Sequence, residues 1–174
     1  MKKINVFIDI AGDMDCMGVD MMSGNSEDYQ LEISDEQYTL LKGLNKDELS
    51  LEDLQSLIEQ GHANLQELVD KIHVLRRELV LSQGVEEAKD NMEEYCDLED
   101  CCAKAEALGW VKPDEIDLDE DDDDYDEAYE EWEEEVRESI LEFVEDKTIW
   151  QQADILGVDT YDYDVDYTIV ITME

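Results

Sequence analysis

Negative charge constrains this chain more than any other feature of its sequence. Fifty-two Asp and Glu residues stand against twelve Lys and Arg residues, which gives a formal net charge of −40 at pH 7 over 174 residues. A small domain needs a net charge of only ~2–8 to stay soluble, and a larger excess opposes compact folding through self-repulsion. Solubility alone is therefore a poor explanation, and we expect the charge to serve recognition of a basic partner.

The chain nevertheless contains enough hydrophobic residues to build a core. They make up 43% of the sequence, more than is typical of acidic disordered polypeptides. The length suits one typical domain, so we expect residues 1–174 to form a single domain. Asp9 interrupts the apolar stretch after the first lysines, and no apolar run approaches the ~20 residues of a membrane span. We expect a cytoplasmic protein with reduced cysteines.

Strand patterns lie near both ends of the chain. Residues 3–10 are rich in β-branched side chains and 29–33 alternate, so both are predicted strands, joined by a long loop or loose hairpin connection over 11–28. A last strand is predicted over 161–172, with its tyrosines and isoleucines on one face and its aspartates on the other.

Helical patterns fill the middle of the chain. A capping box at Ser34 and Gln37 predicts one helix start, and Gly84 and Gly109 are expected to end two longer helices. The predicted helices cover 34–42, 50–61, 65–84, 85–108 and 126–146. Together with the strands, they predict an α+β domain whose small, largely antiparallel sheet comes from the N- and C-terminal strands and is packed with four to five helices.

The composition changes sharply after Pro113, the only proline in the chain. Residues 114–146 contain twenty acids and one base, Arg137. We predict an acidic loop over about 114–126, followed by an amphipathic helix whose outer face is almost entirely carboxylate. The apolar face of that helix is predicted to contain Tyr129, Trp132, Val136, Ile140 and Phe143. Adaptation to a high-salt cytoplasm usually spreads acids over the whole surface, whereas here they are concentrated.

Two ordered rows of acids follow from this pattern. The carboxylate row lies on the outer face of the predicted helix and consists of Glu127, Glu131, Glu134, Glu138, Glu142 and Glu145. Like charges at this spacing oppose helix formation by roughly 0.2–0.5 kcal/mol per pair. The strand row consists of Asp162, Asp164 and Asp166, roughly 6.6–6.8 Å apart along one strand face. Regularly spaced carboxylates resemble a run of phosphates, so a protein that binds nucleic acid through Lys and Arg would meet a similar pattern here.

Signals for metal or catalytic chemistry are weak. Residues 119–130 place acids where a calcium loop needs them, but Asp124 stands where the sharp turn needs glycine. The spacing of Cys96, Cys101 and Cys102 lacks the pairs of zinc motifs. The chain has no glycine-rich phosphate loop and no nucleophile elbow. We expect no enzyme activity, no cofactor and no dedicated metal site.

The size, the pI of about 4.1 and the two rows resemble those of the DNA-mimic proteins of phages and mobile elements, such as anti-restriction and anti-CRISPR inhibitors. The resemblance is one of composition and charge layout, and it implies an inhibitor that fills the basic groove of a defence nuclease or related enzyme. The expected phosphate surrogates are Asp117, Asp119, Asp121, Asp122, Asp123, Asp124, Glu130, Glu131, Glu134, Glu138, Glu142, Asp162, Asp164 and Asp166. Tyr125 and Tyr161 are expected at the rim.

Two other interpretations stay open. An immunity protein or antitoxin that neutralises a basic nuclease toxin would use a compact interface with aromatic hot spots rather than a long charge track. An acidic chaperone for basic proteins would depend mainly on the loop at 114–127. In all three cases the partner is a basic protein, and neither nucleic acid nor a membrane is expected to bind directly.

Overall fold

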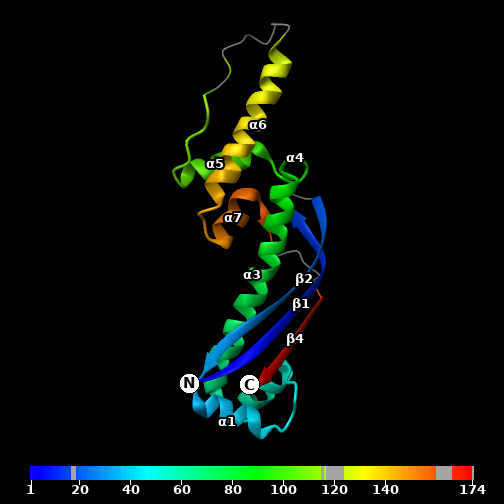
Figure 1. Ribbon diagram of the computed structural model, residues 1–174, viewed down its shortest axis with the longest axis vertical. Coiled ribbons are helices and arrows are strands. Elements are labelled where there is room, and N and C mark those ends of the chain that lie inside the picture. Colours follow the sequence, from blue (N-terminus) through cyan, green and yellow to red (C-terminus); the bar gives the residue numbers. More distant parts are fainter. Residues whose placement is uncertain (17–18, 115, 117–123, 160–165, 174) are drawn as a thin grey trace. The chain divides into compact units, whose positions relative to one another are not determined.

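The computed structural model describes residues 1–16, 19–114, 116, 124–159 and 166–173 (Figure 1). Their contacts group into two compact units. Unit 1 comprises Met1–Asp13, Met22–Gln83 and Tyr163–Glu174, and unit 2 comprises Met14–Met21 and Gly84–Asp162. Strand β1 (Lys2–Cys16) and helix α3 (Gln66–Asp90) contribute residues to both units.

The fold is α+β with a sheet built from N- and C-terminal strands, as the sequence predicts. Strand β1 is hydrogen-bonded to β2 (Val19–Ile33) on one side. Its other side pairs antiparallel with β4 (Asp166–Met173), from Ile4 opposite Met173 to Ala11 opposite Asp166. Nearer its end, β1 pairs antiparallel with β3 (Val158–Asp159).

The long loop predicted over 11–28 is wrong, and the alternative of a loose hairpin connection over these residues is far too long, because β1 extends to Cys16 and β2 begins at Val19. The glycines and polar residues of this stretch have low strand propensity when judged one by one. Strand propensity depends strongly on context, however, and hydrogen bonding between adjacent strands outweighs the local preference here. The two strands therefore continue well beyond the apolar segments from which they were predicted.

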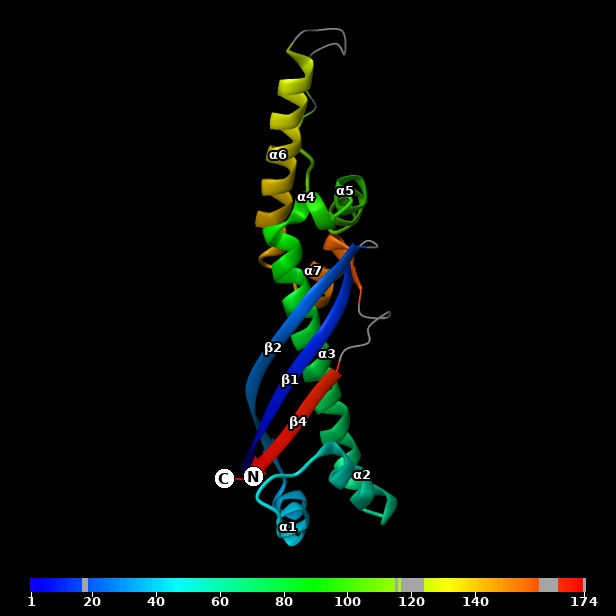
Figure 2. The same cartoon turned by 90° about the vertical axis from the view of Figure 1, so that its right-hand side faces the viewer.

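The core of unit 1 lies between the sheet and α3. Alternate residues of β1 point into it, and Ile4, Val6, Ile8 and Ile10 are at most 1% exposed. The part of α3 that belongs to unit 1 runs along one face of the strands, as the two views show (Figures 1 and 2). It contributes Ile72 and other buried residues at helical spacing.

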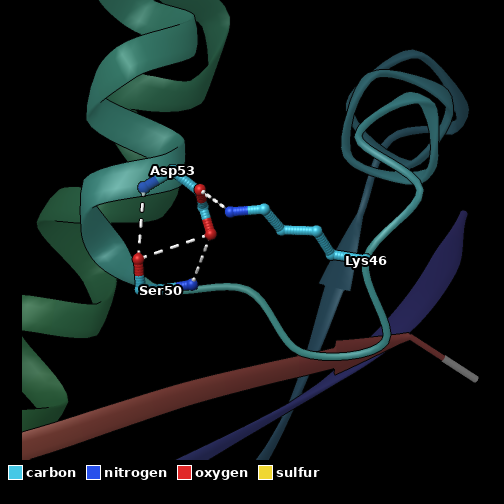
Figure 3. A network of polar contacts seen from close by, with 3 residues as sticks. All are labelled: Lys46, Ser50 and Asp53. Atoms are coloured by element: carbon cyan, nitrogen blue, oxygen red, sulfur yellow. Dashed lines mark hydrogen bonds and ion pairs between the residues drawn. The ribbon is translucent and has the colours of Figure 1, made fainter.

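Short capped helices complete unit 1. Helix α1 (Asp35–Gly43) begins at the predicted capping box of Ser34 and Gln37, and α2 (Leu51–Glu59) begins at a second one, formed by Ser50 and Asp53. The Asp53 carboxylate accepts a hydrogen bond from the Ser50 backbone N–H at 3.0 Å and pairs with the Lys46 ammonium at 2.5 Å (Figure 3). A short 3-10 helix, η1 (Ala63–Leu65), then leads into α3.

Unit 2 is helical apart from its strand segments. After the last residues of α3 come α4 (Met92–Tyr95), α5 (Leu98–Ala107), α6 (Tyr125–Val144) and α7 (Ile149–Leu156). The described residues thus contain seven α-helices rather than four to five. Buried side chains of α5, α6 and α7, among them Cys102, Ile140 and Leu156, form the core.

The predicted boundary at Gly84 and the single helix predicted over 85–108 are both wrong. Helix α3 continues through Gly84 to Asp90, and the rest of the segment divides into α4 and α5. A glycine costs a helix interior only about 1 kcal/mol, and the buried Leu81, Val85 and Ala88 outweigh it. Asp97 starts a new helix, because its side chain accepts a hydrogen bond from the Asp100 backbone N–H at 2.9 Å.

Trp110 lies between α5 and α6 in the sequence and is largely buried in unit 2. Its indole Nε1–H donates a hydrogen bond to the Ser139 hydroxyl of α6 at 3.0 Å. The segment around Pro113 has no regular secondary structure, as its composition predicts. Within the described ranges, no helix has the length and apolar character needed to cross a membrane.

Candidate functional site

Helix α6 lies within two residues of the helix predicted over 126–146. Val136 and Ile140 of the predicted apolar face are buried, and so is Val144, which the prediction omitted although it follows Ile140 by one helical turn. Tyr129 differs from the expectation, since 39% of it is exposed. The C-terminal half of α6 is thus the part that packs into the core of unit 2.

The carboxylate row lies on the opposite side of α6, and all six of its members are exposed. Successive residues of an α-helix are about 100° apart, so the spacing of these six places them within an arc of roughly 80°. They extend over about 27 Å along the axis, from Glu127 to Glu145. The row is therefore nearly straight and runs along the whole helix.

Very little basic charge compensates this row. The Arg137 guanidinium contacts Glu133 at 3.2 Å and Glu134 at 3.5 Å, so one member of the row shares a cation with a neighbour outside it. The other five have no ion-pair partner among the residues that the structure describes. The last turn of α6 contains Glu142 and no basic residue, an arrangement that opposes the helix dipole.

The other expected surrogates are described only in part. Asp124 and Glu130 are exposed at the start of α6, and Asp166 is exposed at the start of β4. The remaining expected acids lie outside the described residues: Asp117, Asp119, Asp121, Asp122, Asp123, Asp162 and Asp164. Tyr161 also lies outside them, as do residues 119–123 of the calcium-like stretch. The carboxylate row of α6 is accordingly the part of the candidate site with a defined geometry.

A groove between α5 and α6 is a feature that sequence reasoning missed. Its volume is about 630 Å³. Helix α5 contributes Glu99, Cys102 and Glu106 to its lining, and α6 contributes Tyr129 and Trp132. The two glutamates are seven residues apart and so share one face of α5, but no sequence pattern indicated that this face adjoins α6. Lys112 also lines the groove.

Two aromatic side chains, Tyr129 and Trp132, form one wall of this groove. The Tyr125 and Tyr129 rings stack with their centroids 5.9 Å apart, and the Trp132 ring lies 5.6 Å from that of Tyr129. The Lys112 ammonium lies over the Trp132 ring, 4.9 Å from its centroid. The Trp132 Nε1–H is buried and has no hydrogen-bond acceptor among the described residues. The negative charge of the nearby Glu133 raises the pKa of Tyr129.

Two of the cysteines whose side chains the structure describes are buried in α5. Cys101 and Cys102 are buried free thiols in α5, and burial raises the pKa of Cys102, which disfavours the reactive thiolate. Among the described side chains, no three of His, Cys, Asp or Glu are placed to hold a metal ion. Comparisons of this chain with protein-family models, with curated proteins and with solved structures find no match.

Proposed function

We propose that this protein is a nucleic-acid-mimicking inhibitor, which occupies the basic DNA- or RNA-binding groove of a host defence nuclease or related enzyme. The observation that carries the proposal is the carboxylate row of α6, which is exposed, nearly straight and largely without basic partners. Bound in such a groove, it would exclude the substrate by direct competition. A groove that has evolved to bind phosphates supplies the cations that this helix lacks.

The charge density of the row supports this proposal. Six carboxylates are spread over about 27 Å of helix axis. One strand of duplex DNA carries a phosphate every ~3.4 Å of axis, hence about eight over the same distance. The row therefore approaches one DNA strand in charge per unit length, and packing of the C-terminal half of α6 holds that part of its backbone in place.

The local energetics point in the same direction. The row contains five successive like-charge pairs at spacings of three or four residues, and each costs roughly 0.2–0.5 kcal/mol. Cations of a partner groove would remove this repulsion on binding. They would also make association fast and sensitive to salt, because exposed charges are screened beyond ~10 Å at 0.1 M ionic strength.

A charge-reversal experiment with a matched control tests the proposal. The row variant replaces four members of the row by lysine: Glu131, Glu134, Glu138 and Glu142. The control variant makes the same net change at four exposed glutamates of unit 1: Glu27, Glu32, Glu48 and Glu59. Wild type and both variants serve as bait in low-salt lysate, and partners retained by wild type are eluted with rising salt. Each purified partner is then titrated with a labelled DNA or RNA duplex in the presence of each protein.

We expect wild type and the control variant to raise the partner's apparent dissociation constant for nucleic acid competitively. The row variant is expected to be at least ~10-fold less potent, because four attractive contacts become repulsive. Equal potency of the row variant and wild type would contradict the proposal. So would inhibition that does not change with ionic strength.

A further inference from the structure

We propose that the groove between α5 and α6 binds one arginine side chain of the basic partner. This inference rests on the proposed function only in that the partner is a basic protein. It adds a specific contact to the general attraction of the carboxylate row. It also places that contact on α5 and on the inner side of α6, where no residue of the row lies.

Two carboxylates of the groove are available to a cation. Glu99 and Glu106 are exposed and have no ion-pair partner within the described part of the chain. They lie about 10.5 Å apart along the α5 axis. The other two acids of the lining already have internal roles: Asp97 caps α5, and Glu133 binds Arg137.

The aromatic wall fits a flat cation. A guanidinium stacks on aromatic faces and donates paired hydrogen bonds to carboxylates, so it uses both kinds of group at once. The Lys112 ammonium over the Trp132 ring shows that this wall attracts a cation within the chain itself. Tyr129 retains a partly exposed ring beside it.

The remaining properties of the groove favour an arginine within a peptide chain over other ligands. Four carboxylates against the single Lys112 give the lining a formal charge of −3, which repels phosphates and nucleic acid. Leu98 and Val136 offer apolar surface to the methylene groups of the side chain. The volume of about 630 Å³ also leaves room for adjoining backbone.

Peptide titration of the ¹⁵N-labelled full-length protein at low salt tests the inference. The probe is acetyl-Gly-Arg-Gly-amide, and the readout is the set of indole N–H signals of Trp110, Trp132 and Trp150, assigned with W132F. We expect a saturable shift of the Trp132 signal, while the signal of the partly exposed Trp150 stays nearly constant. The corresponding citrulline peptide has the same shape but no charge, and it is expected to bind at least ~10-fold more weakly. The lysine peptide is expected to bind about threefold more weakly, because it cannot form the paired bonds.

Two double variants locate the site. Glu99→Gln with Glu106→Gln is expected to weaken binding of the arginine peptide at least ~10-fold. Glu48→Gln with Glu59→Gln removes the same charge from unit 1 and is expected to change it less than twofold. Equal weakening in both double variants would show attraction to the overall charge alone and would overturn the inference. An unchanged Trp132 signal, or equal binding of the citrulline peptide to wild type, would overturn it without any variant.

The outcomes separate this inference from the proposed function. If the arginine peptide fails to bind while the row variant still loses inhibition, the groove is not an arginine site and the proposed function stands. If the peptide binds as expected while the row variant inhibits normally, the groove is confirmed and the carboxylate row is not the inhibitory surface.

Discussion

Helices α3 and α6 are both long, but their sequences are used differently. Helix α3 has buried residues along its whole length, from Leu68 to Ala88. It carries six acids and four bases, with an acid in its first turn and a base in its last. Helix α6 has buried residues only from Val136 onwards, and it carries nine acids and one base. Its last turn has the sign of charge that opposes the helix dipole.

The difference shows which part of the sequence the fold itself explains. In α3 both the apolar pattern and the charge pattern favour the helix and its packing, so no partner is needed to account for them. In α6 the apolar pattern favours packing, whereas the charge pattern opposes it. A local sequence that works against folding in this way is typical of a functional surface.

The largest expected effect concerns the core face of α3. Ile72 has no exposed surface, so Ile72→Ala is expected to lower the free energy of unfolding by about 2–5 kcal/mol, through lost burial and the cavity left behind. Val74 lies two residues away and is 46% exposed, so Val74→Ala is the matched control, with an expected loss below about 1 kcal/mol. Urea denaturation followed by circular dichroism measures both. Similar losses would show that the Ile72 face of α3 is not buried in the core of unit 1.

A smaller effect is expected at the packed half of α6. Ser139→Ala removes the acceptor of the Trp110 indole N–H and leaves that group buried without a partner. The expected cost is about 1–3 kcal/mol of unfolding free energy. Ser56 of α2 is exposed, and Ser56→Ala is expected to be nearly neutral in the same denaturation assay. A neutral Ser139→Ala would mean that this half of α6 depends on apolar packing alone.

A third effect separates a carboxylate that serves the fold from those of α6. The hydrogen bond from Lys46, followed by that from the Ser50 backbone, lowers the pKa of Asp53. Because the folded state favours the ionised form, this contribution is present above the ordinary aspartate pKa and is lost as the pH falls through the folded-state pKa. Asp53→Asn is expected to cost about 1 kcal/mol near pH 7, and progressively less as the pH falls below the ordinary aspartate pKa. Thermal melts over this pH range measure the stability difference between wild type and Asp53→Asn, with Asp47→Asn at an exposed position as the control. A difference that does not change with pH would show that the Asp53 carboxylate is not involved.

The smallest expected effect has opposite signs in the two helices. Glu138→Gln removes like-charge repulsion with Glu135 and Glu142, and with Glu134, whose charge Arg137 partly neutralises, and is expected to raise the free energy of unfolding by about 0.4–1 kcal/mol. Glu67→Gln removes a favourable charge from the first turn of α3 and is expected to lower it by about 0.3–1 kcal/mol. Both differences should shrink in 1 M salt. A destabilising Glu138→Gln would show that basic groups compensate the carboxylate row.

The sequence predicted those parts of the fold that depend on local patterns. Helix α6, the capping box of α1 and the start of α2 follow from local spacings, and the structure places them within two residues of the prediction. The continuation of α3 through Gly84 and of β1 to Cys16 depends on tertiary packing and strand pairing, which outweigh local preference and leave no signature in a single stretch of sequence.

The candidate site was predictable to a similar degree. The carboxylate row follows from helical periodicity alone, because five of its members lie in one helix and Glu145 is the C-cap residue of that helix. The groove of Glu99, Glu106 and Tyr129 combines two helices, and their packing against each other is not encoded in the period of either one. The partial exposure of Tyr129 likewise depends on where the supporting helices end, which its spacing from Val136 does not reveal.

The bridge between Leu49 and β4 has a consequence for how this protein behaves with copies of itself. Leu49 N–H donates to the Ile171 carbonyl at 2.9 Å, and Ile171 N–H donates back to Leu49 at 2.8 Å, on the side of β4 that faces away from β1. An open strand edge is a template on which further copies of a chain can polymerise. Repulsion between negatively charged molecules prevents this in dilute buffer, but concentrated salt screens that repulsion. Leu49 occupies part of the free edge of β4. This part of the edge therefore stays protected against pairing with another copy of the chain even in concentrated salt, where repulsion between molecules is screened.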